Sequence, residues 1–198
     1  MHNYLGHRKA GIRDNLEPMT TDQTIAPFAA AVYTPDTADR MALLKFVEKL
    51  KSSHIRVGGV LQEAIYDSAG EITGLDAVDV ATNQRIPISR PSKNDEECGL
   101  DVSALAETTR IIRDAINERL DLVVVEKFGE LEQDGRGLID EIFQTIAEGI
   151  PLLISVPEAA LPVWQQRSGE LGSVLDFSEQ AFQQWWQALE QASSTNTN

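Results

Sequence analysis

Short apolar runs and helical periods alternate along most of the chain. The runs lack polar alternation, which is typical of strands buried on both faces of a sheet: "PFAAAVY", "IRVGGVLQ", "DLVVVEKFG" and "IPLLISV". The segments between them repeat apolar residues at helical spacing: "DRMALLKFVEKLKS", "SALAETTRIIRDAINERL" and "LIDEIFQTIAEG". We expect everything after the last strand to be helical. This order predicts a three-layer α/β fold with a mainly parallel sheet flanked by helices.

One segment departs from this alternation. From Ala64 to Arg90, turn signals at "DSAGE" and "ATNQ" separate stretches with β-branched residues, which predicts an inserted antiparallel hairpin or meander. Just before it, Gly58 and Gly59 interrupt a strand. Glycine inside a strand indicates a bulge or a close backbone approach.

The two ends of the chain lack either period. Residues 1–25 mix Gly, Pro, Thr, Asn and charged residues, which predicts a flexible leader. The ending "ASSTNTN" predicts a disordered tail over 192–198. Residues 26–191 are therefore expected to form a single domain.

The chain is strongly acidic, with 31 Asp and Glu against 17 Lys and Arg, a net charge of −14 in 198 residues. A general affinity for nucleic acid or anionic membrane is not expected, because phosphate groups are bound by clustered Lys and Arg. With Cys98 alone, neither an internal disulfide nor a multi-cysteine zinc site can form. We found no apolar run long enough for a membrane span or an export signal, so we expect no membrane insertion and a cytoplasmic location.

The parallel sheet also predicts where a ligand binds. Open α/β sheets bind ligands outside the carboxyl ends of their strands, so the loops after Tyr33, Gln62, Val125 and Val156 should surround one pocket. Arg136 follows a Gly-rich turn near the same edge and is suited to clamping a carboxylate, a phosphate or an oxometalate.

Two segments also resemble a known pattern, in the same order. "YTPDTADRMALL" stands where the small nucleoside triphosphatases first described in hyperthermophiles carry their phosphate-binding loop. "LDLVVVEKFGELE" resembles the strand that in that family ends in Asp-Glu, followed by hydrophobic-Gly-x-Met-Glu. "IRVGGVLQEAIYDSAGEITGLDAVDV" resembles the Gly-containing strand and hairpin of the same family.

A second resemblance is closer. "GGVLQ", "CGLD", "DLVVVEKFGELEQDGRG" and "GIPLLISV" are similar to an uncharacterised bacterial family, catalogued as a domain of unknown function. Some of its members carry the label "molybdenum transporter ATP-binding protein". Together the resemblances cover Ala29 to Trp164 and imply the architecture of the phosphate-binding-loop (P-loop) NTPases, with a nucleotide or molybdate as ligand.

Set against the first pattern, the loop lacks what nucleotide hydrolysis needs. Thr37, Ala38 and Asp39 stand where glycine and flexible residues are expected. Arg40 takes the place of the lysine and can still pair with an oxyanion. Met41 takes the place of the hydroxyl that holds Mg²⁺, and a thioether is a poor ligand for a hard cation.

The second segment also lacks a group that nucleotide hydrolysis requires. Glu126 matches the acidic residue that binds magnesium, but Lys127 replaces the Glu that orients or activates the attacking water. Gly129 and Glu132 match the end of the pattern. The resemblance therefore implies a remodelled site that binds an anion and does not hydrolyse nucleotides.

Each feature also has a plainer interpretation. The first loop is equally typical of an ordinary connection in which Asp36 or Thr37 caps the following helix. A lone cysteine is more often a small packed hydrophobe than a nucleophile. The three tryptophans either form an aromatic contact surface or, for those near the chain end, dock an amphipathic helix on the core: Trp164, Trp185 and Trp186.

The preferred hypothesis is a ligand-binding or accessory protein with a degenerate phosphate-binding loop, binding a small anion or nucleotide, with a role in molybdenum metabolism. We assign no catalytic residue. One alternative is an active nucleoside triphosphatase with a non-standard loop, and another is an interaction module with a vestigial pocket that contacts a protein partner or a second copy. The candidate ligand-binding residues are Thr34, Asp36, Thr37, Asp39, Arg40, Gln62, Cys98, Asp101, Glu126, Lys127, Gly129, Glu132 and Arg136.

Overall fold

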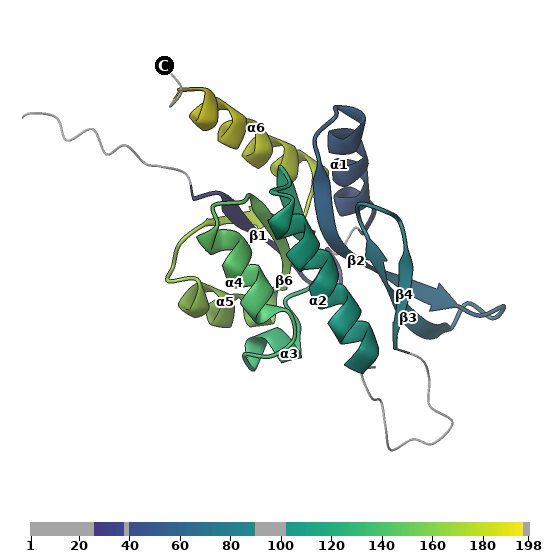
Figure 1. Ribbon diagram of the computed structural model, residues 1–198. Helices are drawn as coiled ribbons and strands as arrows, with labels where there is room; N and C mark the ends of the chain where they lie inside the picture. The colour runs from purple at the N-terminus through teal and green to yellow at the C-terminus, as the bar shows by residue number, and fades with distance from the viewer. Residues whose placement is uncertain (1–25, 38–39, 90–101, 196–198) are drawn as a thin grey trace, which may run out of the picture.

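The computed structural model describes residues 26–37, 40–89 and 102–195. Its centre is a seven-stranded sheet with the strand order β4-β3-β2-β5-β6-β1-β7 (Figure 1). The strands β2, β5, β6, β1 and β7 run parallel, and β3 and β4 extend the sheet antiparallel from β2. The bounds are β1 (Phe28–Tyr33), β2 (Val57–Tyr66), β3 (Ile72–Asp79), β4 (Arg85–Ser89), β5 (Leu122–Val125), β6 (Leu152–Pro157) and β7 (Ser173–Asp176).

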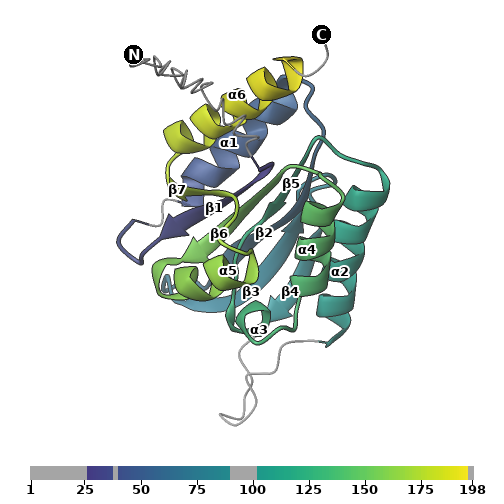
Figure 2. The same cartoon turned by 90° about the vertical axis from the view of Figure 1, so that its left-hand side faces the viewer.

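Helices cover both faces of this sheet. Figure 2 shows α1 (Arg40–Ser52) and α6 (Glu179–Thr195) together on one face. The opposite face carries α2 (Val102–Asn117), α4 (Ile139–Ala147) and α5 (Leu161–Arg167), with the short α3 (Glu130–Gln133) nearby and the 3₁₀ turn η1 (Glu158–Ala160) before α5. The prediction of a three-layer, mainly parallel α/β fold with an inserted antiparallel hairpin is therefore confirmed.

Alternating side chains along the central strands build two cores. Leu153 of β6 and Val124 of β5 pack under α1 and α6, whereas Ile154 and Val123 pack under α2, α4 and α5. All four are at most 1% exposed. The absence of polar alternation in these strands thus has its physical cause in burial on both faces.

Some element boundaries differ from the prediction. The segment after β6 was expected to be wholly helical, but β7 pairs with β1 and forms an edge of the sheet. β2 continues to Tyr66, so the first strand of the inserted hairpin is the second half of a central strand. α6 continues to Thr195, past the predicted domain end at residue 191, and hydroxyls of its last turn donate to carbonyls four residues earlier.

The tryptophans are parts of the core. Trp164 is 1% exposed, and Trp185 and Trp186 are 5% and 8% exposed. Trp185 and Trp186 pack with α1 under the sheet, so α6 docks on the core as an amphipathic helix. The idea that these side chains form an exposed aromatic surface is wrong, because their area is already buried within the chain.

Among the described residues, no helix has the length and apolar character that crossing a membrane requires.

Candidate functional site

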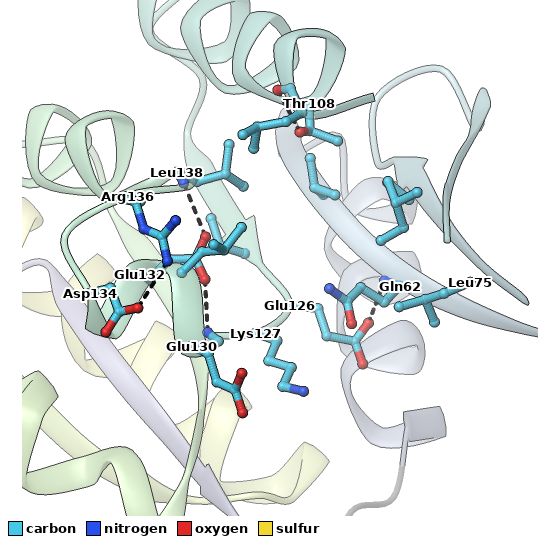
Figure 3. A pocket seen from close by; sticks show the side chains of 17 residues that line it. Gln62, Leu75, Thr108, Glu126, Lys127, Glu130, Glu132, Asp134, Arg136 and Leu138 are labelled. Atoms are coloured by element: carbon cyan, nitrogen blue, oxygen red, sulfur yellow. Dashed lines mark hydrogen bonds and ion pairs between the residues drawn. The ribbon is translucent and has the colours of Figure 1, made fainter. Parts of the chain in front are cut away.

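A cavity of about 480 Å³ opens at the carboxyl edge of the sheet, between β2, β3, α2 and the loop after β5 (Figure 3). Apolar side chains from the sheet and from α2 line much of it, among them Val60, Ala77 and Leu105. Charged and polar side chains also line it. Six of the predicted residues meet here: Gln62, Glu126, Lys127, Gly129, Glu132 and Arg136.

Glu126 and Lys127 directly follow the end of β5, and both line this cavity. The Glu126 backbone N–H continues the sheet by donating to the Val60 carbonyl at 2.8 Å. Its carboxylate turns toward β2, where Oε2 accepts the backbone N–H of Gln62 at 2.8 Å (Figure 3). A carboxylate held by a backbone amide has a fixed direction, so Glu126 presents its charge at a defined place.

Lys127 is exposed and has a φ of 126°, a region that residues with a side chain rarely adopt. Strain of this kind persists only where the surrounding structure enforces it, and it concentrates at functional sites. Within the described part of the chain, the Lys127 ammonium forms no ion pair. Figure 3 shows Glu126, Lys127 and Glu130 at one end of the cavity and Thr108 at the other.

Phe128 fixes the loop that carries these charges. Its side chain is fully buried and meets Trp164 edge to face, with ring centroids 5.4 Å apart. Its backbone N–H donates to the Ser155 carbonyl of β6 at 2.8 Å. The alternating exposure of Lys127 and Phe128 follows from this anchor: one side chain enters the core and its neighbour is turned outward.

Glu132 braces the same loop from inside. It is 8% exposed, and its two carboxylate oxygens accept the backbone N–H groups of Gly129 at 2.9 Å and Leu138 at 3.0 Å. Gly137, with φ of 63°, leaves the space that this carboxylate occupies, since a Cβ there would lie 2.1 Å from Glu132 Oε1. The structure thus gives Glu132 a backbone-bracing role in addition to a place on the cavity wall.

Arg136 lies on the cavity rim and is exposed. Its guanidinium donates to Asp134 Oδ2 at 3.0 Å, an exposed pair of the kind that contributes little to stability. A ligand anion can therefore compete for this guanidinium at low cost.

The turn after β1, from Thr34 to Thr37, does not line this cavity. The Thr34 N–H donates to Thr37 Oγ1 at 2.8 Å, the Thr37 N–H donates to the Thr34 carbonyl at 3.1 Å, and the two hydroxyls are 3.0 Å apart. Asp36 is exposed within this turn. α1 begins at Arg40, so neither Asp36 nor Thr37 is the residue directly before the helix. Asp39, Cys98, Asp101 and the Arg40 side chain lie outside what the structure describes.

A smaller cavity of about 170 Å³ adjoins the first and shares Gln62, Leu75, Glu126 and Lys127 with it. It is completed by residues that were not among the predicted ligand-binding residues: Tyr33, Ser155 and Phe177. A signal for Ser155 was present, because it is the one hydroxyl in the apolar run "LLISV" near the carboxyl end of its strand. Glu126 and Lys127 therefore line both cavities.

The chain is similar to several known proteins. A relative 35% identical over 159 residues is a molybdenum import ATP-binding protein, ModC 2, of Bradyrhizobium diazoefficiens; the match covers 80% of this chain and 18% of that protein. The chain thus spans less than a fifth of the relative's length. The nucleoside-triphosphatase THEP1 of Thermoplasma volcanium is 26% identical over 132 residues, covering 63% of this chain and 72% of THEP1.

The fold has a solved counterpart in the crystal structure of THEP1 from the hyperthermophile Aquifex aeolicus, with a TM-score of 0.59 and 16% sequence identity. That match covers 77% of this chain and 91% of the THEP1 chain, so the architecture is that of the P-loop NTPases. A family model described as "Protein of unknown function (DUF2478)" matches residues 28–185. This chain therefore belongs to the DUF2478 family.

Proposed function

We propose that this domain binds a nucleotide or another small anion around the end of β5, and that it serves as an accessory domain rather than as a hydrolase. The observation that carries the proposal is the placement of Glu126 and Lys127. Both line the two adjoining cavities, with the carboxylate held by the Gln62 N–H and the ammonium turned outward. A positive and a negative group at one strand end are suited to a ligand that carries anionic oxygens and a bound cation.

The turn after β1 supports the second half of the proposal. Phosphate-binding loops point consecutive backbone N–H groups at the phosphates. Here the N–H groups of Thr34 and Thr37 are already used within the turn. Lys127 stands where the resemblance to the triphosphatases requires a water-activating carboxylate, so this position offers an ammonium group in place of a base.

The name of the ModC 2 relative motivates molybdate as one candidate anion. Because that relative is a much longer ATP-binding protein, we propose that the domain serves such a protein as a ligand-sensing module. The cavity chemistry fits phosphate, molybdate and a nucleotide phosphate alike, since each offers oxygens to Lys127 and Arg136.

A thermal-shift panel tests the proposal. The purified protein is heated with ATP, GTP and ADP, each with and without Mg²⁺, and with molybdate, tungstate, sulfate and phosphate. A ligand at about 100 times its dissociation constant stabilises the fold by roughly 2.7 kcal/mol, which raises the melting temperature visibly. Lys127→Ala should weaken the effective ligand about tenfold or more, because a hydrogen bond to a charged group is lost.

Lys45→Ala is the matched control, since Lys45 is an exposed lysine on α1 that lines neither cavity. If the Lys127→Ala and Lys45→Ala proteins bind the ligand with equal affinity, the ligand does not bind at the end of β5. Phosphate release from ATP that requires Mg²⁺ and is abolished by Glu126→Gln would instead favour an active triphosphatase, as the THEP1 names suggest.

A further inference from the structure

Ser155 carries a buried hydroxyl for which the described part of the chain provides no hydrogen-bond partner. The residue is 2% exposed, and its Oγ has neither a donor nor an acceptor within reach in that part. Buried polar side chains in native proteins are nearly always hydrogen-bonded, and each exception calls for an explanation. A group outside the protein is the simplest partner for this hydroxyl.

The register of the sheet places Ser155 beside the charged end of β5. Ser155 pairs with Ala31 of β1, and the preceding Ile154 pairs with Val125 of β5. Ser155 therefore stands level with Glu126, in the strand that separates β5 from β1. Because Leu153 belongs to the core under α1 and α6, Ser155 two residues later faces the same side of the sheet.

The space beside Ser155 is large enough for a ligand group. The cavity of about 170 Å³ is also lined by Tyr33, Glu126 and Lys127. A single water needs only roughly 10–15 Å³ on the same kind of measure, so this cavity exceeds the needs of one bridging water. Its walls combine a hydroxyl, an ammonium group and a carboxylate within one small volume.

We infer that Ser155 is a ligand-binding residue whose hydroxyl donates to an anionic oxygen of the ligand that Lys127 attracts. This inference rests on the proposed function and adds the side of the sheet on which the anionic end lies. That side is the one covered by α1 and α6, whereas the larger cavity lies under α2 and adjoins the smaller one at Glu126 and Lys127. The ligand thus reaches across the ends of three neighbouring strands, β5, β6 and β1.

Ser155→Ala tests the inference. Removing a hydroxyl for which the described residues provide no partner should leave the melting temperature of the unliganded protein unchanged or slightly raised. The affinity should fall about tenfold, as expected when one hydrogen bond to a charged ligand is lost, in separate titrations with ATP plus Mg²⁺ and with molybdate. Loss of affinity without loss of stability is the result that a purely structural serine does not give.

Ser168→Ala is the matched control. Ser168 is 9% exposed, and its hydroxyl donates to the Gln165 carbonyl at 3.2 Å, remote from both cavities. This control should lower the melting temperature and leave affinity unchanged. Wild-type affinity in Ser155→Ala would overturn the inference while the proposed function stands, and so would a lowered melting temperature with unchanged affinity. If the wild-type protein binds neither probe, the proposed function fails and this inference fails with it.

Discussion

The loop after β5 and the turn after β1 leave the same edge of the sheet, but they are held by different forces. The loop after β5 has two buried anchors, the Phe128 ring and the Glu132 carboxylate. The turn after β1 is exposed and is closed mainly by hydrogen bonds between Thr34 and Thr37. A charged group can be held in a strained, outward position only where the chain around it is fixed, and Lys127 stands on the anchored loop.

The largest expected effect comes from removing the inner brace of the anchored loop. Glu132→Ala leaves the partly buried backbone N–H groups of Gly129 and Leu138 without their acceptor. Each such loss costs about 1–3 kcal/mol, so we expect a destabilisation of about 3 kcal/mol. For a domain of this size that lowers the melting temperature by roughly 10 °C, which a thermal melt measures directly.

The neighbouring Glu130→Ala provides the control, because Glu130 is exposed on the same short helix. Its melting temperature should stay near that of the wild type. If both variants melt alike, the loop after β5 is not held from inside, and the contrast between the two loops disappears.

Part of this structure could be predicted from the sequence, and part could not. The central strands and the helices followed from periodicity, because burial on both faces removes polar residues from β5 and β6. β7 was missed because its four residues alternate in exposure and include only short apolar stretches. The bracing role of Glu132 could not be predicted from the sequence, since it depends on backbone N–H groups that a turn of the chain brings to one carboxylate.

The candidate site was predicted better as a place than as a set of roles. Gln62, Glu126, Lys127 and Arg136 do line one cavity, because the end of β5 pairs with Val60 in the middle of β2, two residues before Gln62. The turn with Thr34 and Thr37 does not, because its own hydrogen bonds close it. A sequence pattern predicts which loop lies near a ligand, but it does not show whether the backbone N–H groups of that loop already donate hydrogen bonds within the loop.

A smaller effect, with opposite signs for stability and binding, is expected at Lys127. Lys127→Gly relieves the cost of a side chain at φ of 126°. That relief of about 1–3 kcal/mol outweighs the added flexibility of glycine, about 0.5–1 kcal/mol, so we expect a net gain of about 1 kcal/mol. The same variant should bind the anionic ligand about tenfold more weakly, because the ammonium group is gone.

Lys127→Ala separates the two causes, because alanine removes the charge and keeps the strained Cβ. It should bind as weakly as Lys127→Gly in a titration and yet melt at about the wild-type temperature. A glycine variant that is no more stable than the alanine variant would show that the backbone at Lys127 is unstrained, and the anchored loop would then lose its distinguishing feature.

The smallest effect is expected at the turn after β1. Thr37→Ala removes the hydroxyl that accepts the Thr34 N–H, but the exposed amide can bond to water instead. We therefore expect a loss below about 1 kcal/mol in chemical denaturation. Affinity for ATP or molybdate should stay within about twofold, because Thr37 lines neither of the two cavities at the end of β5. If Thr37→Ala instead weakens binding as much as Lys127→Ala, the turn itself contacts the ligand, and its closed hydrogen bonds must open when the ligand enters.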